Sequence, residues 1–111
     1  RLARALGKCT GLTHLSLGHN RIGDEGVRRL ARVPHVWECK DLAHLNLEDN
    51  RIGADGAGWL AAQLRKCKAL AHLNLGDNQI GSTGAGRLAE ALRKCTALEH
   101  LNLENNLLGN K

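Results

Sequence analysis

The segment LAHLNLEDNRIG, from Leu42 to Gly53, indicates the architecture of this chain because the chain repeats it. Related copies begin at Leu12 (LTHLSLGHNRIG), at Leu70 (LAHLNLGDNQIG) and at Leu98 (LEHLNLENNLLG). Successive copies start 30, 28 and 28 residues apart in a chain of 111 residues. A regular period of this length with the pattern L-x-x-L-x-L-x-x-N predicts a solenoid of stacked, nearly equivalent units.

Each unit is predicted to contain a short strand followed by a helix. In the quoted phrase, Leu45 and Leu47 alternate with polar residues, as in a strand with one buried face. Asn50 follows where the chain must turn, and its amide can both donate and accept, so stacked copies can satisfy loop backbone groups. Farther along, Leu60, Leu64 and Cys67 are spaced as one apolar stripe of a helix.

Two glycines occur near the start of each predicted helix. Gly23, Gly53 and Gly81 mark the turn into it, and the side chains close behind them are candidate helix caps. A second glycine lies within the first turn, where we expect two backbones to approach closely. The candidate caps are Asp24, Asp55 and Ser82, and the second glycines are Gly26, Gly56 and Gly84.

The two most regular units are LAHLNLEDNRIGADGAGWLAAQLRKC (42–67) and LAHLNLGDNQIGSTGAGRLAEALRKC (70–95). They resemble the ribonuclease-inhibitor-type subclass of leucine-rich repeats, and the resemblance covers essentially the whole chain. It implies an α/β horseshoe segment with a parallel sheet on the concave face and helices on the convex face. That subclass includes ribonuclease inhibitors, sensor domains of innate-immune receptors, the GTPase-activating protein of Ran, and cytoskeletal or assembly proteins.

The expected organisation is one leucine-rich-repeat domain over residues 1–111. It comprises a partial repeat over 1–11, repeats starting at residues 12, 42 and 70, and a partial repeat over 98–111. Both ends interrupt a repeat, which indicates a fragment of a longer array or a segment whose ends are covered by neighbouring subunits.

The outward face of the strands is predicted to be a partner-binding surface. The third position of each strand phrase is always histidine, and the fifth is serine or asparagine. Because neighbouring strands lie ~4.8 Å apart, equivalent side chains should stack in columns. Acidic residues follow where the strands end. The predicted concave partner-binding residues are His14, His44, His72, His100, Asn46, Asn74, Asn102, Glu48, Asp49 and Asp77.

The histidine column allows two interpretations. The favoured one is a polar surface column copied with the repeat, because no mixed set of metal ligands is expected to converge there. The alternative is a transition-metal site, or a pH-responsive stack in which each added proton repels the next. We therefore predict no metal, no cofactor and no catalytic residues.

Two tryptophans mark the predicted convex partner-binding surface. Trp59 takes a position that is arginine in the other repeats, so it should be exposed, either as an interface residue or as a cation–π contact over arginine stems. Pro34 should end the preceding helix near residues 32–33. Residues 35–37 would then form an outer bulge, either as a tolerated insertion, which we favour, or as a docking feature that presents Trp37.

Four cysteines recur once per repeat, at Cys9, Cys39, Cys67 and Cys95. One residue per period and the absence of a C-x-x-C motif favour a column of buried free thiols over disulfides or zinc ligands. Buried thiols indicate a reducing compartment such as the cytosol, the nucleus or an organelle stroma.

These features predict an intracellular, non-enzymatic scaffold that recognises another protein. No apolar run approaches the ~18 residues of a membrane span, so no membrane insertion is expected. The net charge of +5 arises mainly from basic residues of the helices and the returns after them. Two alternatives stay open: a regulator of the small-GTPase-activator type, and RNA binding through the basic convex side, which lacks an aromatic platform.

Overall fold

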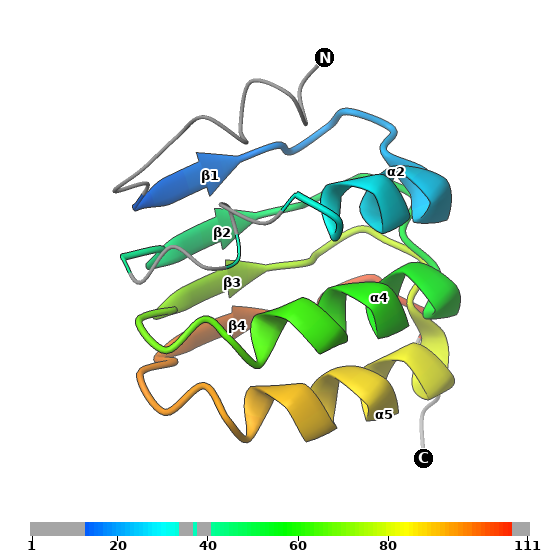
Figure 1. The fold of residues 1–111 in the computed structure, drawn as a ribbon. Helices are drawn as coiled ribbons and strands as arrows, with labels where there is room; N and C mark the ends of the chain where they lie inside the picture. The colour runs from blue at the N-terminus through cyan, green and yellow to red at the C-terminus, as the bar shows by residue number, and fades with distance from the viewer. Residues whose placement is uncertain (1–12, 34–36, 38–40, 108–111) are drawn as a thin grey trace.

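The structure, a computed structural model, describes residues 13–33, 37 and 41–107. Strand and helix alternate along it. In chain order the described elements are β1 (His14–Ser16), α2 (Gly23–Leu30), β2 (His44–Asn46), α4 (Ala54–Leu64), β3 (His72–Asn74), α5 (Gly81–Leu92) and β4 (His100–Asn102). Figure 1 shows the strands in one layer and the helices in a second layer along one side of it. This arrangement confirms the predicted leucine-rich-repeat fold.

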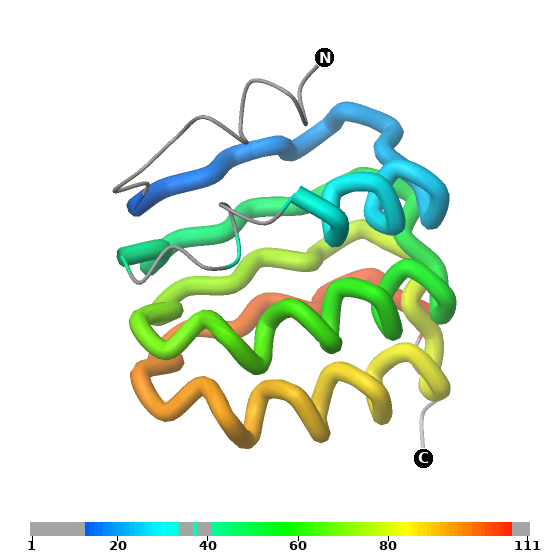
Figure 2. The backbone as a smooth tube through the Cα atoms, in the orientation of Figure 1, coloured from blue at the N-terminus to red at the C-terminus, as the bar shows by residue number. Residues whose placement is uncertain are grey.

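The strands form one parallel sheet in the order β1-β2-β3-β4. Equivalent residues pair without any shift, so that Leu15 lies opposite Leu45, Leu45 opposite Leu73, and Leu73 opposite Leu101. The same pairing continues beyond the strands as backbone hydrogen bonds, and the backbone therefore follows the same path from one unit to the next (Figure 2).

Leucines from both layers make the core between sheet and helices. Leu45 and Leu73 of the strands and Leu60 and Leu88 of the helices are buried, as the repeat pattern predicts. Leu101 is the exception, with 44% of its surface exposed, because no further described unit packs against β4.

A ladder of buried asparagines holds the turns after the strands. Asn78 Oδ1 accepts from the backbone N–H groups of Asn50 (2.9 Å) and Ile52 (3.0 Å) in the preceding repeat. Its Nδ2 donates to the carbonyls of Leu47 and Leu75 at 3.0 and 2.9 Å. Asn50 and Asn106 are also buried and make bonds of the same kind. The predicted role of this column is confirmed.

The predicted caps do not cap their own helices. None of the three described helices has a side-chain hydrogen bond at its N-cap. Asp24 instead reaches the next repeat, where its Oδ1 accepts from the N–H groups of Gly53 (2.6 Å) and Gly56 (3.0 Å) at the start of α4. A carboxylate at this position also interacts favourably with the positive end of the α4 helix dipole. The cap therefore ties two units together.

The second glycines lie where packing is tight. A Cβ on Gly84 would lie 3.1 Å from Ala54 Cα and 3.2 Å from Ala57 Cβ, both of α4. A Cβ on Gly56 would lie 3.3 Å from Asp24 Cα of α2. The predicted close approach is confirmed at these two positions, whereas Gly26 faces the side chain of Ile22 in its own repeat.

Helix α2 ends at Leu30, slightly before the predicted residues 32–33. Its last turn tightens, because Arg32 and Val33 donate to carbonyls three residues back. Pro34 and His35 lie outside the described residues.

The prediction that Trp37 is a docking residue on the convex surface is wrong. It is only 1% exposed, and its Nε1–H donates to the Leu30 carbonyl at 2.9 Å. The indole therefore provides a hydrogen-bond donor for a carbonyl at the end of α2 and is part of the hydrophobic core. Helix α2 is shorter than the equivalent helix of the next repeat, with 8 residues against 11 in α4.

Candidate functional site

The four predicted histidines stack into one ladder across the concave face. Their ring centroids are 4.0, 4.2 and 4.5 Å apart from His14 to His100, and neighbouring rings are tilted by only 10°, 7° and 7°. The unshifted parallel register causes this, because it places equivalent side chains one strand spacing apart. We refer to His14, His44, His72 and His100 as the histidine ladder.

Within the ladder, protonation of His44 is disfavoured. Burial lowers the pKa of His44 from its ordinary value, and repulsion from His14 and His72 lowers it further. His14, at the β1 end of the ladder, makes a hydrogen bond between its Nδ1 and Thr13 Oγ1 at 2.9 Å. At neutral pH His44 therefore offers a flat, uncharged ring to a partner.

A row of asparagines runs beside the ladder and presents hydrogen-bond donors. Asn46, Asn74 and Asn102 each accept, through Oδ1, the backbone N–H two residues later at 2.9 Å. A backbone N–H can only donate, so the oxygen of each amide faces inward and its NH₂ group is left for other partners. The Asn74 NH₂ group lies 3.4 Å from Glu48 Oε1. We call these three residues the asparagine row.

The predicted acidic residues form a rim after the strands. Asp49 contacts His19, with 2.8 Å between Oδ2 and Nδ1, and Asp77 accepts from Asn105 Nδ2 at 2.8 Å. The hydrogen bond to Asp49 is the largest of several acidic influences that raise the pKa of His19. Glu48, Asp49 and Asp77 are called the acidic rim below.

His19 and Asn105 were missing from the predicted site. Both occupy the position that aspartate holds in the other two repeats, and all four residues at this position have positive φ values between 55° and 60°. That shared column position was the signal that could have found them.

The ladder and the asparagine row line one open groove of about 490 Å³ on the outer surface of the sheet. Ser16 completes the row in β1. Ten predicted concave residues are therefore brought together as two adjoining features: the groove contains the histidines and asparagines, and the acidic rim borders the ends of its strands.

The convex side carries a second hollow, about 620 Å³ in volume, beside Trp59. Trp59 is 38% exposed, as predicted. Arg87 lines the hollow. Its Nη1 donates to the Ala54 carbonyl at 3.1 Å and lies 3.7 Å from Asp55 Oδ1. Among the described aromatic side chains, ring contacts occur only within the histidine ladder, so the cation–π alternative for Trp59 is not supported.

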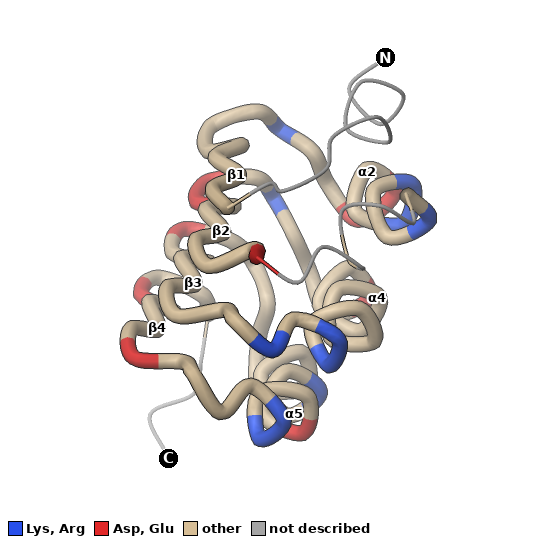
Figure 3. Tube along the Cα trace, turned by 60° about the vertical axis from the view of Figure 1, so that its left-hand side comes forward, with Lys and Arg blue, Asp and Glu red and all other residues tan. Residues whose placement is uncertain are grey.

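Charge divides between the two faces. Figure 3 shows most lysines and arginines along the helices and the turns after them, and acidic residues along the strand side. The asymmetry matches the expectation from the sequence that the convex side is basic and that acidic residues follow where the strands end.

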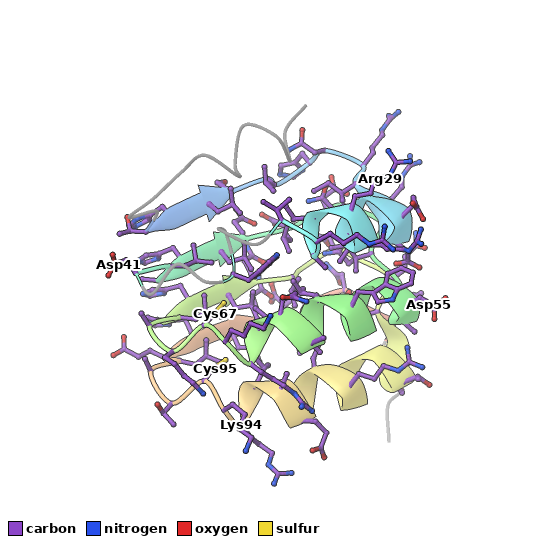
Figure 4. The ribbon with its side chains drawn as sticks, viewed as in Figure 1. Arg29, Asp41, Asp55, Cys67, Lys94 and Cys95 are labelled. Atoms are coloured by element: carbon purple, nitrogen blue, oxygen red, sulfur yellow. The ribbon has the colours of Figure 1, made fainter. Side chains whose placement is uncertain are left out.

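Cys67 and Cys95 lie one repeat apart between the sheet and the helices, as Figure 4 shows. The thiol of Cys95 is free and donates to the Leu64 carbonyl at 3.3 Å, and burial raises its pKa. This confirms the predicted buried thiol at Cys95. Cys9 and Cys39 lie outside the described residues.

One group of metal-ligand atoms was not anticipated. His72, Glu99 and His100 each place one ligand atom within 4.8 Å of the others. The expectation that no mixed ligand set would converge on the ladder was wrong at this end, because the sequence period does not show which way Glu99 points.

Sequence comparison shows that the chain belongs to the leucine-rich repeat family. The family described as "Leucine Rich repeat" matches residues 8–31, 38–61 and 66–89. No curated protein sequence matches the chain significantly. None of the helices in the described residues is long and apolar enough to cross a membrane.

Two solved structures are similar in fold. A domain described as "Leiomodin-1 Actin-Binding Site 2 (ABS2)" superposes with a TM-score of 0.79 at 20% identity, over 94% of this chain and 60% of its own. The C-terminal domain of tropomodulin from Caenorhabditis elegans gives 0.77 at 17% identity, over 93% of this chain and 61% of its own. The present chain thus spans about three-fifths of each relative's length, and at this identity the likeness shows the fold.

Proposed function

We propose that this chain is a non-enzymatic recognition module that binds an extended segment of a partner protein along its concave face. The observation that carries the proposal is the fixed direction of the asparagine row. Its amide oxygens accept from backbone N–H groups, which leaves its NH₂ groups as donors beside the groove, and the NH₂ group of Asn74 lies 3.4 Å from Glu48 Oε1.

The partner chemistry follows from this surface. A row of donors suits the backbone carbonyls of an extended peptide, and the stacked imidazoles of the histidine ladder offer flat surfaces for its side chains. The acidic rim suits lysine or arginine where the peptide leaves the groove. The proposed ligand is therefore an extended, basic segment of another protein.

The proposal includes the finer predictions from the sequence. We assign the chain to the ribonuclease-inhibitor-type subclass, because the two regular repeats are 28 residues apart and carry helices of 11 and 12 residues. We also propose that residues 1–111 form one leucine-rich-repeat domain. The buried free thiol of Cys95 supports a reducing, intracellular location.

The test is selection of peptides from a random display library on the purified chain, followed by titration of the selected peptide. Asn74→Ala removes a donor from the groove, and Glu48→Gln removes a charge from the rim. We expect each to weaken binding by about 5-fold or more, the loss of one ~1 kcal/mol hydrogen bond or charge contact. Actin is a reasonable first protein ligand, because the leiomodin domain is described as an actin-binding site.

Matched controls separate the two faces. Lys94→Ala changes an exposed charge on the convex side and should leave peptide binding unchanged, and thermal melts should show that every variant stays folded. Selected peptides without basic residues, or binding that survives both concave substitutions, would contradict the proposal.

The convex hollow is a second candidate surface, because Trp59 is exposed beside a cavity rather than on a flat face. Tryptophan is enriched among residues that dominate binding energy at interfaces. If Trp59→Ala abolishes binding of a selected ligand and the concave variants do not, the convex side is the binding face.

A further inference from the structure

We infer that the β4 end of the histidine ladder is a binding site for a divalent transition-metal ion of the zinc class, with His72, Glu99 and His100 as its ligands. The three ligand atoms, one from each side chain, already lie within 4.8 Å of one another. The site shares His72 and His100 with the groove proposed for the peptide, but it is argued from these three side chains alone and does not depend on peptide binding.

The backbone explains how Glu99 reaches the histidines. Neighbouring residues of a regular strand point to opposite faces. Here the N–H groups of both Glu99 and His100 donate to the same carbonyl, that of Ala71, at 2.8 and 3.0 Å. Two consecutive N–H groups that share one acceptor depart from a regular parallel ladder, in which the hydrogen bonds are evenly spaced. Glu99 lies just before β4, where the alternation of a regular strand does not apply, and a carboxylate oxygen of Glu99 lies within 4.8 Å of ring nitrogens of His72 and His100.

Only one step of the ladder has this ligand set in the described chain. The residue before the histidine is Thr13, Ala43 and Ala71 in the other three repeats, and none of these offers a carboxylate. The backbone of each paired repeat has the same double hydrogen bond, so the difference lies in the side chain alone. Glu99 thus adds an oxygen ligand to a histidine pair that the repeat already supplies.

The ligand set suits zinc. Two imidazole nitrogens and one carboxylate oxygen, with water in the fourth position, make a common three-residue zinc site. Zinc–nitrogen distances of ~2.0–2.1 Å require ligand atoms about 3.3 Å apart in a tetrahedron, so the three side chains must close slightly. The rings of His72 and His100 must also tilt from their 7° stack, because a metal lies in the plane of each imidazole. Glu99 and His100 are exposed and His72 is half-buried, so they have room to rotate.

The test is titration of the whole chain with Zn²⁺ by calorimetry and with Co²⁺ by visible absorption. We expect one ion per chain at this site, a Co²⁺ spectrum of a low-coordinate nitrogen and oxygen site, and movement of the His72 and His100 imidazole NMR signals. Glu99→Gln and His100→Ala should each weaken binding by more than about 10-fold, since even partners outside the ligand set cost 10–100-fold.

Two controls distinguish this site from general binding by surface histidines. His14→Ala removes a ring from the far end of the histidine ladder, and Glu104→Gln removes another exposed carboxylate near β4. Both should retain wild-type affinity within about 2-fold, and circular dichroism should confirm that all variants are folded.

The inference is overturned if Glu99→Gln binds as tightly as the wild type, or if His14→Ala loses as much affinity as His100→Ala. A thiolate-to-cobalt charge-transfer band would also overturn it, because the metal would then be held by cysteine. The same conclusion would follow if the His72 and His100 signals did not move.

Discussion

Asparagine has two different roles within each repeat, and only its position distinguishes them. Asn78 is buried, and both ends of its amide bond to the backbone of its own and the preceding repeat. Asn74, four residues earlier, lines the groove; its oxygen accepts from a backbone N–H group, and its NH₂ group lies 3.4 Å from Glu48 Oε1. The first role stabilises the fold, and the second equips the surface for binding.

Replacement of the buried amide should be costly. Asn78→Ala leaves the N–H groups of Asn50 and Ile52 without their acceptor and several carbonyls without their donor. Each buried group left unpaired costs ~1–3 kcal/mol, so we expect a loss of at least about 3 kcal/mol in the free energy of unfolding. Urea denaturation measures it.

The neighbouring exposed residue is the control. Gln79→Ala removes an exposed side chain one position later and should change the free energy of unfolding by less than about 0.5 kcal/mol. A loss below 1 kcal/mol for Asn78→Ala would show that water or a rearranged loop replaces the asparagine ladder.

Two histidines should give the fold opposite responses to pH. The pKa of His44 is lowered, so its neutral form stabilises the fold above the unfolded-state pKa near 6.5, and this contribution is lost as pH falls. The pKa of His19 is raised by Asp49, so its contribution is present below that pKa and is lost as pH rises through the folded-state value.

Single variants compared with the wild type across pH isolate each histidine. Between pH 7.5 and pH 5 the free energy of unfolding should fall less for His44→Gln than for the wild type, because the variant lacks the histidine whose protonation is unfavourable in the folded state. The stability deficit of His19→Gln should be larger at pH 6 than at pH 8.5. Denaturation midpoints that shift in parallel with the wild type at every pH would contradict both assignments.

At the scale of elements, the spacing of neighbouring helices depends on one glycine. Gly84 lies against α4, where an added Cβ would meet the backbone at Ala54. Gly86 is two residues later in the same helix, and an added Cβ there would meet nothing within 4 Å. The two glycines are a matched pair in one helix with opposite surroundings.

The pair predicts opposite effects of one substitution. Gly84→Ala should destabilise the fold by about 1–3 kcal/mol, because α5 must move away from α4. Gly86→Ala should stabilise it by about 0.5–1 kcal/mol, because alanine has less backbone entropy to lose in a helix. Thermal and urea unfolding measure both. Equal effects of the two substitutions would mean that α5 packs less closely than described.

At the scale of the whole molecule, the layers place the two tryptophans in different environments. Trp37 is a core residue bonded to the end of α2, and Trp59 lies at the rim of the convex hollow. The chain has two tryptophans and no tyrosine or phenylalanine, so its fluorescence reports on these two sites alone.

Fluorescence of single-tryptophan variants should separate them. In Trp59→Phe, the remaining Trp37 should resist quenching by acrylamide and shift to the red only on unfolding. Trp37→Ala should cost about 3–5 kcal/mol, whereas Trp59→Ala should cost less than about 1 kcal/mol. Rapid quenching of Trp37 in the folded state would contradict its placement in the core.

Periodicity made much of the molecule predictable. Leu45, Asn50 and His44 each recur in every repeat, and an unshifted parallel sheet converts such recurrence into columns of buried leucine, bonded asparagine and stacked imidazole. Residues that break the period were harder to predict. Trp37 has no equivalent in the other repeats, and its sequence position alone did not show that it folds inward to the end of a shortened helix.

Spacing along the chain specifies the repeated unit, the face to which each leucine belongs and the columns of the concave surface, so these features were predictable from the amino-acid order alone. Only the folded molecule shows where Asp24 places its carboxylate, where Trp37 packs and how Glu99 reaches the histidines. Those outcomes depend on contacts between neighbouring repeats and on a shared carbonyl at the start of a strand. Such contacts form through space, and no spacing along a single chain specifies them.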